Sequence, residues 1–99
     1  MDNRYSLFVS EGATIDIEDI RDFNEGKKAG LGFDYLEDIL DCLDSIQANP
    51  KSYQYYRTAE VGIRRGVSKR FSLIILYSIN EQISRLEILT VADSRQDWF

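Results

Sequence analysis

The hydrophobic pattern of this chain changes from a helical period to a strand period close to Asn49-Pro50. Before that point, apolar residues recur every three or four positions, as they do on one face of a helix. After it, apolar and polar residues alternate in the ranges 53–56, 61–67, 71–79 and 82–91, and residues 4–9 alternate in the same way. A strand, a helical part and then several strands predict the α+β fold class.

The first half predicts two helices joined by a short break. Ser10 is well placed to cap the first helix, which we expect to reach about Glu25 with Ala13, Ile17 and Ile20 on its apolar stripe. Residues 26–30 contain two glycines and interrupt the pattern. The second helix should run from about Gly32 until Asn49-Pro50 stops it, with an apolar face of Leu36, Ile39, Leu43 and Ile46. So short a connection makes the two helices antiparallel.

The later strands predict an antiparallel meander with a hairpin turn at Asn80-Glu81, which the strand at residues 4–9 joins. Strand 71–79 carries large apolar residues on both faces: Phe71, Leu73, Ile75, Tyr77 and Ile79 on one, and Ile74 and Leu76 between Ser72 and Ser78 on the other. Two helices can cover only one face of the sheet. Ile74 and Leu76, with Phe8, therefore predict an apolar patch that either a partner protein or the chain's own loop or C-terminal tail covers.

The length of 99 residues predicts one domain, residues 1–99, with a single modest core. The longest apolar run, residues 73–77, is far shorter than the roughly 20 residues that span a bilayer, and the N-terminus has no signal pattern. We therefore expect a cytoplasmic protein without a membrane partner. Cys42 is the only cysteine, and its place on an apolar helical stripe predicts a packed, unreactive thiol.

The net charge of −5 is divided unevenly along the chain. Residues 1–50 hold 4 basic and 12 acidic side chains, whereas residues 51–99 hold 8 basic and 5 acidic ones. The small excess of positive charge in the second half is insufficient to neutralise many phosphates of a nucleic-acid backbone. We therefore expect no direct binding of nucleic acid. The asymmetry instead indicates one face for a target and another for a different partner.

The chain contains no histidine, which removes the commonest general base and the commonest metal ligand. It also lacks paired-cysteine zinc spacing, a glycine-rich phosphate loop and the usual hydrolase motifs, so we expect no metal and no cofactor. The helical carboxylates are spaced opposite the apolar stripes, which is typical of a solvated face: Asp16, Glu18, Asp19, Asp22, Asp34, Glu37, Asp38, Asp41 and Asp44.

A basic set in the second half is the best candidate for a binding site: Arg64, Arg65, Lys69, Arg70 and Arg95. Alternation places Arg64 on the sheet face opposite Ile63 and Arg65, and Arg95 should return near this edge. Clustered guanidinium groups would bind phosphate or carboxylate, but pairing with Glu60, Glu87, Asp93 or Asp97 is an equally simple interpretation. Trp98 is suited to stack on a base, to anchor in a partner, or to pack over the sheet edge.

In order and spacing, these features resemble the RelE/ParE superfamily of small bacterial toxins over nearly the whole chain: Gly30-Leu31-Gly32, Asn49-Pro50, Ile63-Arg64-Arg65, the strand 71–77 and the Arg95-containing end. The resemblance implies two helices on one face of a curved antiparallel sheet. It also implies a cognate antitoxin that wraps the toxin with an extended or helical segment and neutralises it.

The superfamily has two branches with different targets. Members similar to RelE cut messenger RNA on the ribosome with sheet arginines and lysines and a C-terminal tyrosine or histidine, whereas members similar to ParE poison DNA gyrase. The ending Val91-Ala-Asp93-Ser-Arg95-Gln-Asp97 resembles the Val-x-His-x-Arg-x-Asp ending of the ParE-like branch, with Asp93 in place of histidine. No tyrosine follows Tyr77, and the pI is about 4.6, which favours gyrase over the ribosome. Ser72 stands where the family usually has proline.

Three hypotheses follow. A gyrase-directed toxin would contact its target through Arg64, Arg65, Lys69, Arg70, Arg95 and Trp98, and its antitoxin through Phe8, Ile74 and Leu76. A RelE-like ribonuclease would use Arg64, Arg65 and Arg95 as catalytic residues, so enzymatic activity remains open. A diverged, non-toxic binding module would keep only the antitoxin-type interface.

Overall fold

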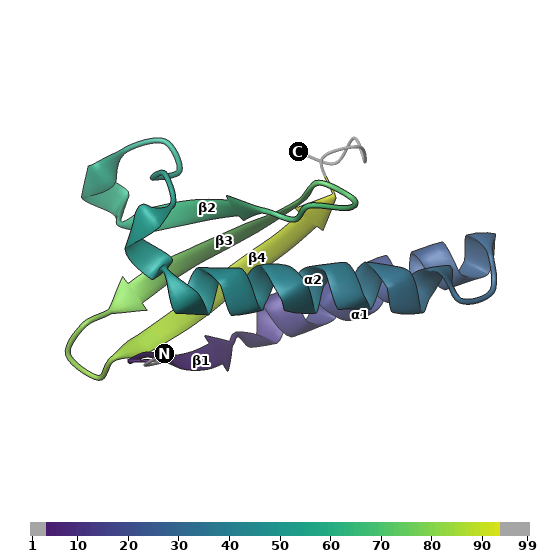
Figure 1. Ribbon diagram of the computed structural model, residues 1–99, viewed down its shortest axis with the longest axis horizontal. Coiled ribbons are helices and arrows are strands. Elements are labelled where there is room, and N and C mark those ends of the chain that lie inside the picture. Colours follow the sequence, from purple (N-terminus) through teal and green to yellow (C-terminus); the bar gives the residue numbers. More distant parts are fainter. Residues whose placement is uncertain (1–3, 94–99) are drawn as a thin grey trace.

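The computed structural model describes residues 4–93, which form one layer of two helices against one four-stranded sheet (Figure 1). The elements in chain order are β1 (Ser6–Val9), α1 (Glu11–Lys27), α2 (Leu31–Ala48), β2 (Ile63–Val67), β3 (Leu73–Asn80) and β4 (Arg85–Asp93), with short 3₁₀ turns at Pro50–Ser52 and Ala59–Val61. The strand order is β1-β4-β3-β2. β1 runs parallel to β4, and the other pairs are antiparallel. The predicted α+β fold is confirmed.

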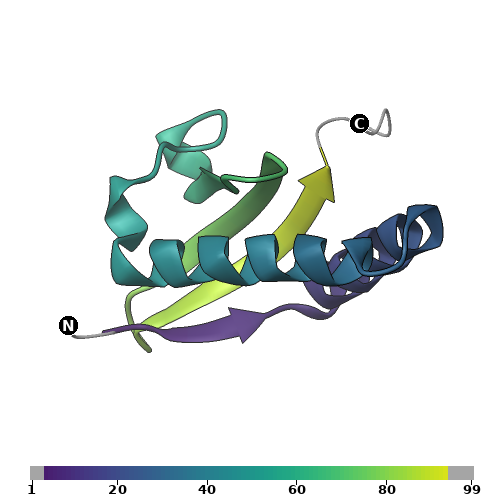
Figure 2. The same cartoon turned by 45° about the vertical axis from the view of Figure 1, so that its right-hand side comes forward.

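The helices begin and connect where the sequence indicates. The Ser10 hydroxyl oxygen accepts a hydrogen bond from the Ala13 N–H at 3.1 Å and caps α1. Gly30 has a φ of 87°, which favours glycine. At Gly32 an added Cβ would lie 2.5 Å from the Arg21 carbonyl oxygen, so only glycine lets α2 approach α1 this closely. The hairpin that these glycines allow extends past the end of the sheet (Figure 2).

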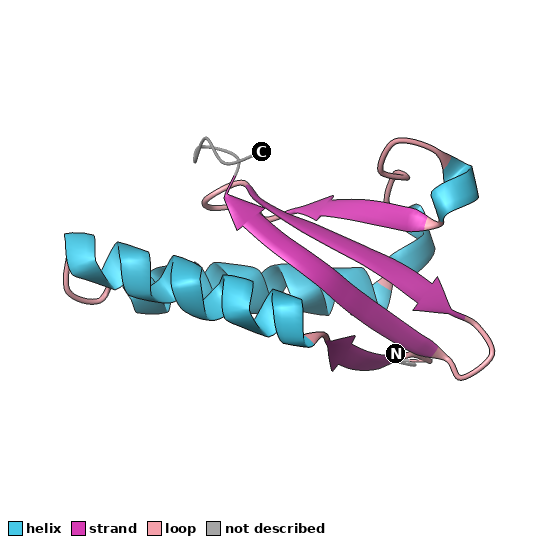
Figure 3. Cartoon of the chain, turned by 180° about the vertical axis from the view of Figure 1, so that it is seen from behind, coloured by secondary structure: helices cyan, strands magenta, loops and turns pink. Residues whose placement is uncertain are grey.

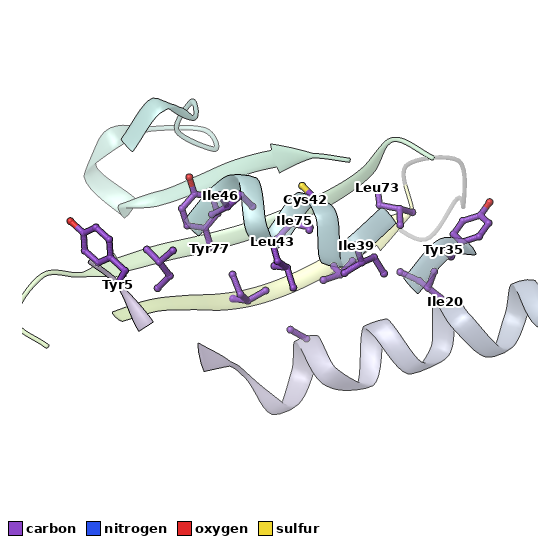
Figure 4. Close-up of a cluster of buried hydrophobic side chains, with 14 residues drawn as sticks. Tyr5, Ile20, Tyr35, Ile39, Cys42, Leu43, Ile46, Leu73, Ile75 and Tyr77 are labelled. Carbon is purple, nitrogen blue, oxygen red and sulfur yellow. The ribbon is translucent and has the colours of Figure 1, made fainter. Parts of the chain in front are cut away.

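The core lies between α2, α1 and the sheet face that they cover. Leu73, Ile75 and Tyr77 of β3 are fully buried, and Figure 4 shows them beside Ile39 and Ile46 of α2. Burial alternates along β3 as predicted, since each intervening residue is only half-buried. Cys42 belongs to the same cluster, which confirms its prediction as a packed thiol. Among residues 4–93, neither helix has a stretch that is long and apolar enough to pass through a lipid bilayer.

The prediction of a strand at residues 53–56 was wrong. Only an isolated bridge between Tyr55 and Arg64 forms there, through hydrogen bonds from the Tyr56 N–H to Ile63 and from the Arg65 N–H to Gln54. The aromatic residues in this segment pack instead of pairing: the Tyr53 ring meets the Tyr77 ring edge-on at 6.2 Å between centroids. β3 also runs through Asn80, so the hairpin turn begins one residue later than predicted.

Two of the helical carboxylates are not on a solvated face, contrary to expectation. Asp38 is 5% exposed and accepts hydrogen bonds from the backbone N–H groups of Arg70 at 3.1 Å and Phe71 at 2.9 Å. Asp16 accepts one from the Val91 N–H at 3.1 Å, next to the bulge where β3 and β4 shift register. Both carboxylates thus tie a helix to a point where the sheet's own hydrogen bonding is interrupted.

Candidate functional site

The face of the sheet turned away from the helices is a candidate interaction surface, which we call the open sheet face. In its register, Leu76 lies between Arg65 and Thr90, and Ile74 lies between Val67 and Ala92. Figure 3 shows β2, β3 and β4 from behind with no helix in front of them. Val67 is 45% exposed, and Ile74 and Leu76 are half-buried. Val67, Ile74 and Leu76 therefore form an apolar patch that no helix of residues 4–93 covers.

Phe8 lies on the open sheet face but at its far edge. It is paired with Glu87 of β4, which in turn pairs with Ser78 of β3. The Arg85 guanidinium lies 4.6 Å from the centre of the Phe8 ring and 2.7 Å from a Glu87 oxygen. A charged pair thus stands beside Phe8, and the proposed antitoxin-contacting residues share one face without forming one continuous apolar patch.

Arg64 and Arg65 are directed to opposite faces of β2, as alternation predicts. The Arg64 guanidinium donates hydrogen bonds to the carbonyl oxygens of Lys51 and Tyr53 and to the Tyr55 hydroxyl, at 3.3, 2.6 and 2.9 Å. It also lies 4.1 Å from the centre of the Tyr55 ring. Arg64 therefore fastens the segment after α2 to β2. Arg65, by contrast, is exposed beside Leu76 and makes no ion pair within residues 4–93.

Lys69 and Arg70 lie in the turn that joins β2 to β3. The Arg70 guanidinium is 4.9 Å from the centre of the Phe71 ring and 3.5 Å from an Asp34 oxygen, and the Phe71 ring stacks on Tyr35 with 3.8 Å between centroids. Both basic residues are exposed. This turn therefore presents two cations at one end of the open sheet face, and Arg70 is already partly neutralised.

The predicted C-terminal contacts Arg95 and Trp98 lie outside the described residues. Asp93, for which the sequence resemblance predicts histidine, is the last residue of β4, is 4% exposed and pairs with Leu73. Within the described residues, the predicted basic set therefore separates into Arg64 on the helix side of β2, Arg65 on the open sheet face, and Lys69 with Arg70 in the turn.

Two groups with reactive side-chain atoms are buried and protonated. Burial, with a smaller contribution from Asp38, raises the pKa of the Cys42 thiol to about 11. Burial also raises the pKa of Tyr77, against the opposing effect of Arg64, and the Tyr77 hydroxyl donates a hydrogen bond of 2.6 Å to the Pro50 carbonyl oxygen. Neither group has the lowered pKa expected of a nucleophile. Residues 4–93 contain no group of three or more acidic, cysteine or histidine side chains placed to hold a metal ion.

A groove of about 450 Å³ between α2 and the end of β2 was not predicted. Its helix wall carries Asp34, Glu37, Asp41 and Asp44, and its other wall includes Val67, Ser68, Lys69 and Arg70. The sequence did contain a signal, because the four carboxylates recur at intervals of three or four residues and so follow one side of the helix.

No family model and no curated protein matches this sequence. Among solved structures, a chain of the chromosomal ParDE toxin-antitoxin system from P. aeruginosa superposes with a TM-score of 0.74 at 16% identity, covering 93% of this chain and 98% of that one.

Two other toxin-antitoxin complexes also match. A chain of RelBE2 from Mycobacterium tuberculosis gives a TM-score of 0.55 at 16% identity, covering 90% of this chain and 96% of that one. A chain of the archaeal RelE-RelB complex from Pyrococcus horikoshii OT3 gives 0.54 at 10% identity, covering 94% and 99%. The strand, the helical hairpin and the sheet of this chain thus form a RelE/ParE-like fold.

Proposed function

We propose that this chain is the toxin of a type II toxin-antitoxin pair, that an antitoxin covering the open sheet face neutralises it, and that its target is DNA gyrase. The observation that carries the proposal is a fold shared over 93% of the chain with the ParDE structure, at a TM-score of 0.74. The half-buried Ile74 and Leu76, which no helix of the described residues covers, support a protein partner at this face.

The choice of gyrase rests on the ParE-like ending and on the charge of the chain. Gyrase is a protein target, whereas a ribosomal nuclease with a net charge of −5 would be repelled by ribosomal RNA. The exposed Arg65 and Lys69, with the partly neutralised Arg70 beside Lys69, are the members of the described basic set that are best placed to contact a target. Arg95 and Trp98 remain in the proposal from the sequence resemblance alone.

A RelE-like ribonuclease has weaker support. Arg64 and Arg65 would have to act on one substrate, but they are directed to opposite faces of β2, and Arg64 already donates three hydrogen bonds to residues 51–55. Tyr77 is fully buried, so it is not available as the acid or base of such a reaction. These contacts favour a binding role for the basic residues over a catalytic one.

Induced expression in a bacterial host that lacks any antitoxin gene tests the proposal. Viable cells are counted, and a reporter plasmid is run on a topology gel, with a version of the gene that contains an early stop codon as the control. We expect loss of viability together with relaxed or cleaved plasmid. Loss of viability with normal topology would move the target to the ribosome, and unimpaired growth at high soluble expression would favour a non-toxic binding module.

A further inference from the structure

The groove between α2 and the end of β2 has one strongly acidic wall. Glu37, Asp41 and Asp44 are exposed along it and make no ion pair within residues 4–93. Asp34, at one end, lies 3.5 Å from the Arg70 guanidinium. Lys69 and Arg70 also line the groove, so its five carboxylates, the buried Asp38 included, exceed its cations by three. The groove is therefore negatively charged overall, and the field in a groove with a protein wall attracts cations more strongly than a flat surface does.

The other wall of this groove contains an unpaired strand edge. The Arg65 N–H is directed away from β3, because it donates to the Gln54 carbonyl oxygen at 2.9 Å. Since alternate residues of a strand direct their backbone groups the same way, the Val67 N–H also points away from β3. It donates no hydrogen bond to the part of the chain that the structure describes. An unpaired edge of this kind accepts a further strand.

The acidic wall is long enough to face a short extended segment. From Asp34 to Asp44 the helix rises about 15 Å, and five residues of extended chain at about 3.3 Å each span that distance. A strand added to β2 would direct alternate side chains toward the acidic wall of α2. The remaining side chains would point to the other side of the sheet, beside Val67 and the open sheet face.

We propose that this groove binds an extended segment of a protein partner in which basic residues alternate with apolar ones, and that the segment adds to the edge of β2. The unpaired stretch of β2 is short, so the attraction between the basic side chains and α2 supplies much of the affinity. This inference deepens the proposed function, on which it rests, because the segment would belong to the neutralising partner.

The probe is a seven-residue peptide of alternating lysine and valine with blocked ends, titrated into the whole purified chain at low salt. Fluorescence anisotropy measures affinity, and the chemical shift of the Val67 amide reports the position. We expect saturable binding, a shifted Val67 amide, and weakening as salt is added. A peptide of alternating glutamate and valine should not bind.

Matched variants distinguish binding in the groove from general electrostatic attraction between the basic peptide and the acidic chain. Asp41→Lys with Asp44→Lys should weaken binding at least tenfold, whereas Glu18→Lys with Asp19→Lys, which has the same net charge on exposed positions of α1, should leave it within twofold. Val67→Pro removes the outward N–H and should weaken binding, and Val67→Thr should not. Equal weakening by both charge pairs, an unshifted Val67 amide at saturation, or no binding to the wild type would overturn the inference.

The peptide titration and the growth assay can each reject one proposal without rejecting the other. Peptide binding can be absent while induced expression still kills cells, which would reject the groove and leave the toxin proposal standing. Peptide binding at the groove together with unimpaired growth would reject the toxin and leave the groove as a site for a basic segment.

Discussion

Arg64 and Arg65 are neighbours in sequence but belong to different surfaces: Arg64 bridges three acceptors in residues 51–55, and Arg65 stands exposed beside Leu76 on the open sheet face. Alternation along β2 produces this separation. A structural role and a binding role are thereby divided between two adjacent arginines, which allows each role to be tested alone.

Replacing each arginine with alanine should affect stability to very different extents. Arg64→Ala removes three charge-assisted hydrogen bonds and should lower the free energy of unfolding by about 1–3 kcal/mol. Arg65→Ala should change it by less than about 0.5 kcal/mol, because the Arg65 side chain is exposed and makes no ion pair within residues 4–93. Urea denaturation followed by circular dichroism measures both. Equal stability of the two variants would show that Arg64 does not fasten the 51–55 segment.

Gly32→Ala should destabilise the helical hairpin. The new Cβ would lie 2.5 Å from the Arg21 carbonyl oxygen, so α1 and α2 would have to move apart, and we expect a loss of about 1–3 kcal/mol. Gly26→Ala is the matched control, since nothing lies within 4 Å of its added Cβ and alanine favours a helix by up to about 1 kcal/mol. In thermal unfolding, the Tm of Gly26→Ala should therefore equal or exceed that of the wild type, and the Tm of Gly32→Ala should be lower.

Asp38→Ala should destabilise the protein more than the same substitution at an exposed carboxylate of α2. The change leaves the N–H groups of Arg70 and Phe71 without their acceptor in a part-buried turn, which costs roughly 1.5–3 kcal/mol. Asp41→Ala, one turn away and exposed, should stay within about 0.5 kcal/mol of the wild type. Similar unfolding midpoints for the two variants would contradict the structural role of Asp38.

Glu81 should titrate below its ordinary value. The pKa of Glu81 is lowered from 4.5 mainly by a hydrogen bond from the Lys51 ammonium. A hydrogen bond from the Tyr5 hydroxyl is the second largest cause. Since the folded pKa is lowered, the contribution to stability is present above pH 4.5 and is lost as the pH falls through the folded pKa. NMR titration of the Glu81 carboxyl should show its pKa rising toward 4.5 in Lys51→Gln. An unchanged pKa in that variant would exclude Lys51 as the main cause.

Hydrophobic periodicity was enough to predict most of the fold. It placed both helices and the two faces of β3, because burial on one side of a helix or strand leaves a regular trace in the sequence. The Ser10 cap was predicted from its residue type at the start of the first helix. It failed at residues 53–56, where the alternating tyrosines pack on Tyr77 and Arg64 and do not form a sheet ladder. Aromatic residues are favoured in both situations, so their spacing alone does not separate them.

The candidate site was less predictable because it depends on contacts between distant segments. The faces of Arg64 and Arg65 followed from alternation, but the acceptors that hold Arg64 lie 9 to 13 residues away. Asp38 could have been recognised, since it falls between Tyr35 and Cys42 at helical intervals on the buried stripe. The unpaired edge at Val67 had no sequence signal, because it exists only where residues 53–56 fail to continue the sheet.

The supercoiling activity of purified DNA gyrase, measured with increasing amounts of the purified chain, tests the proposed function most directly. We expect inhibition that reaches completion with excess wild-type protein and that weakens at least tenfold in Arg65→Ala, a variant expected to remain as stable as the wild type. Normal supercoiling at a large excess of folded protein would contradict gyrase as the target.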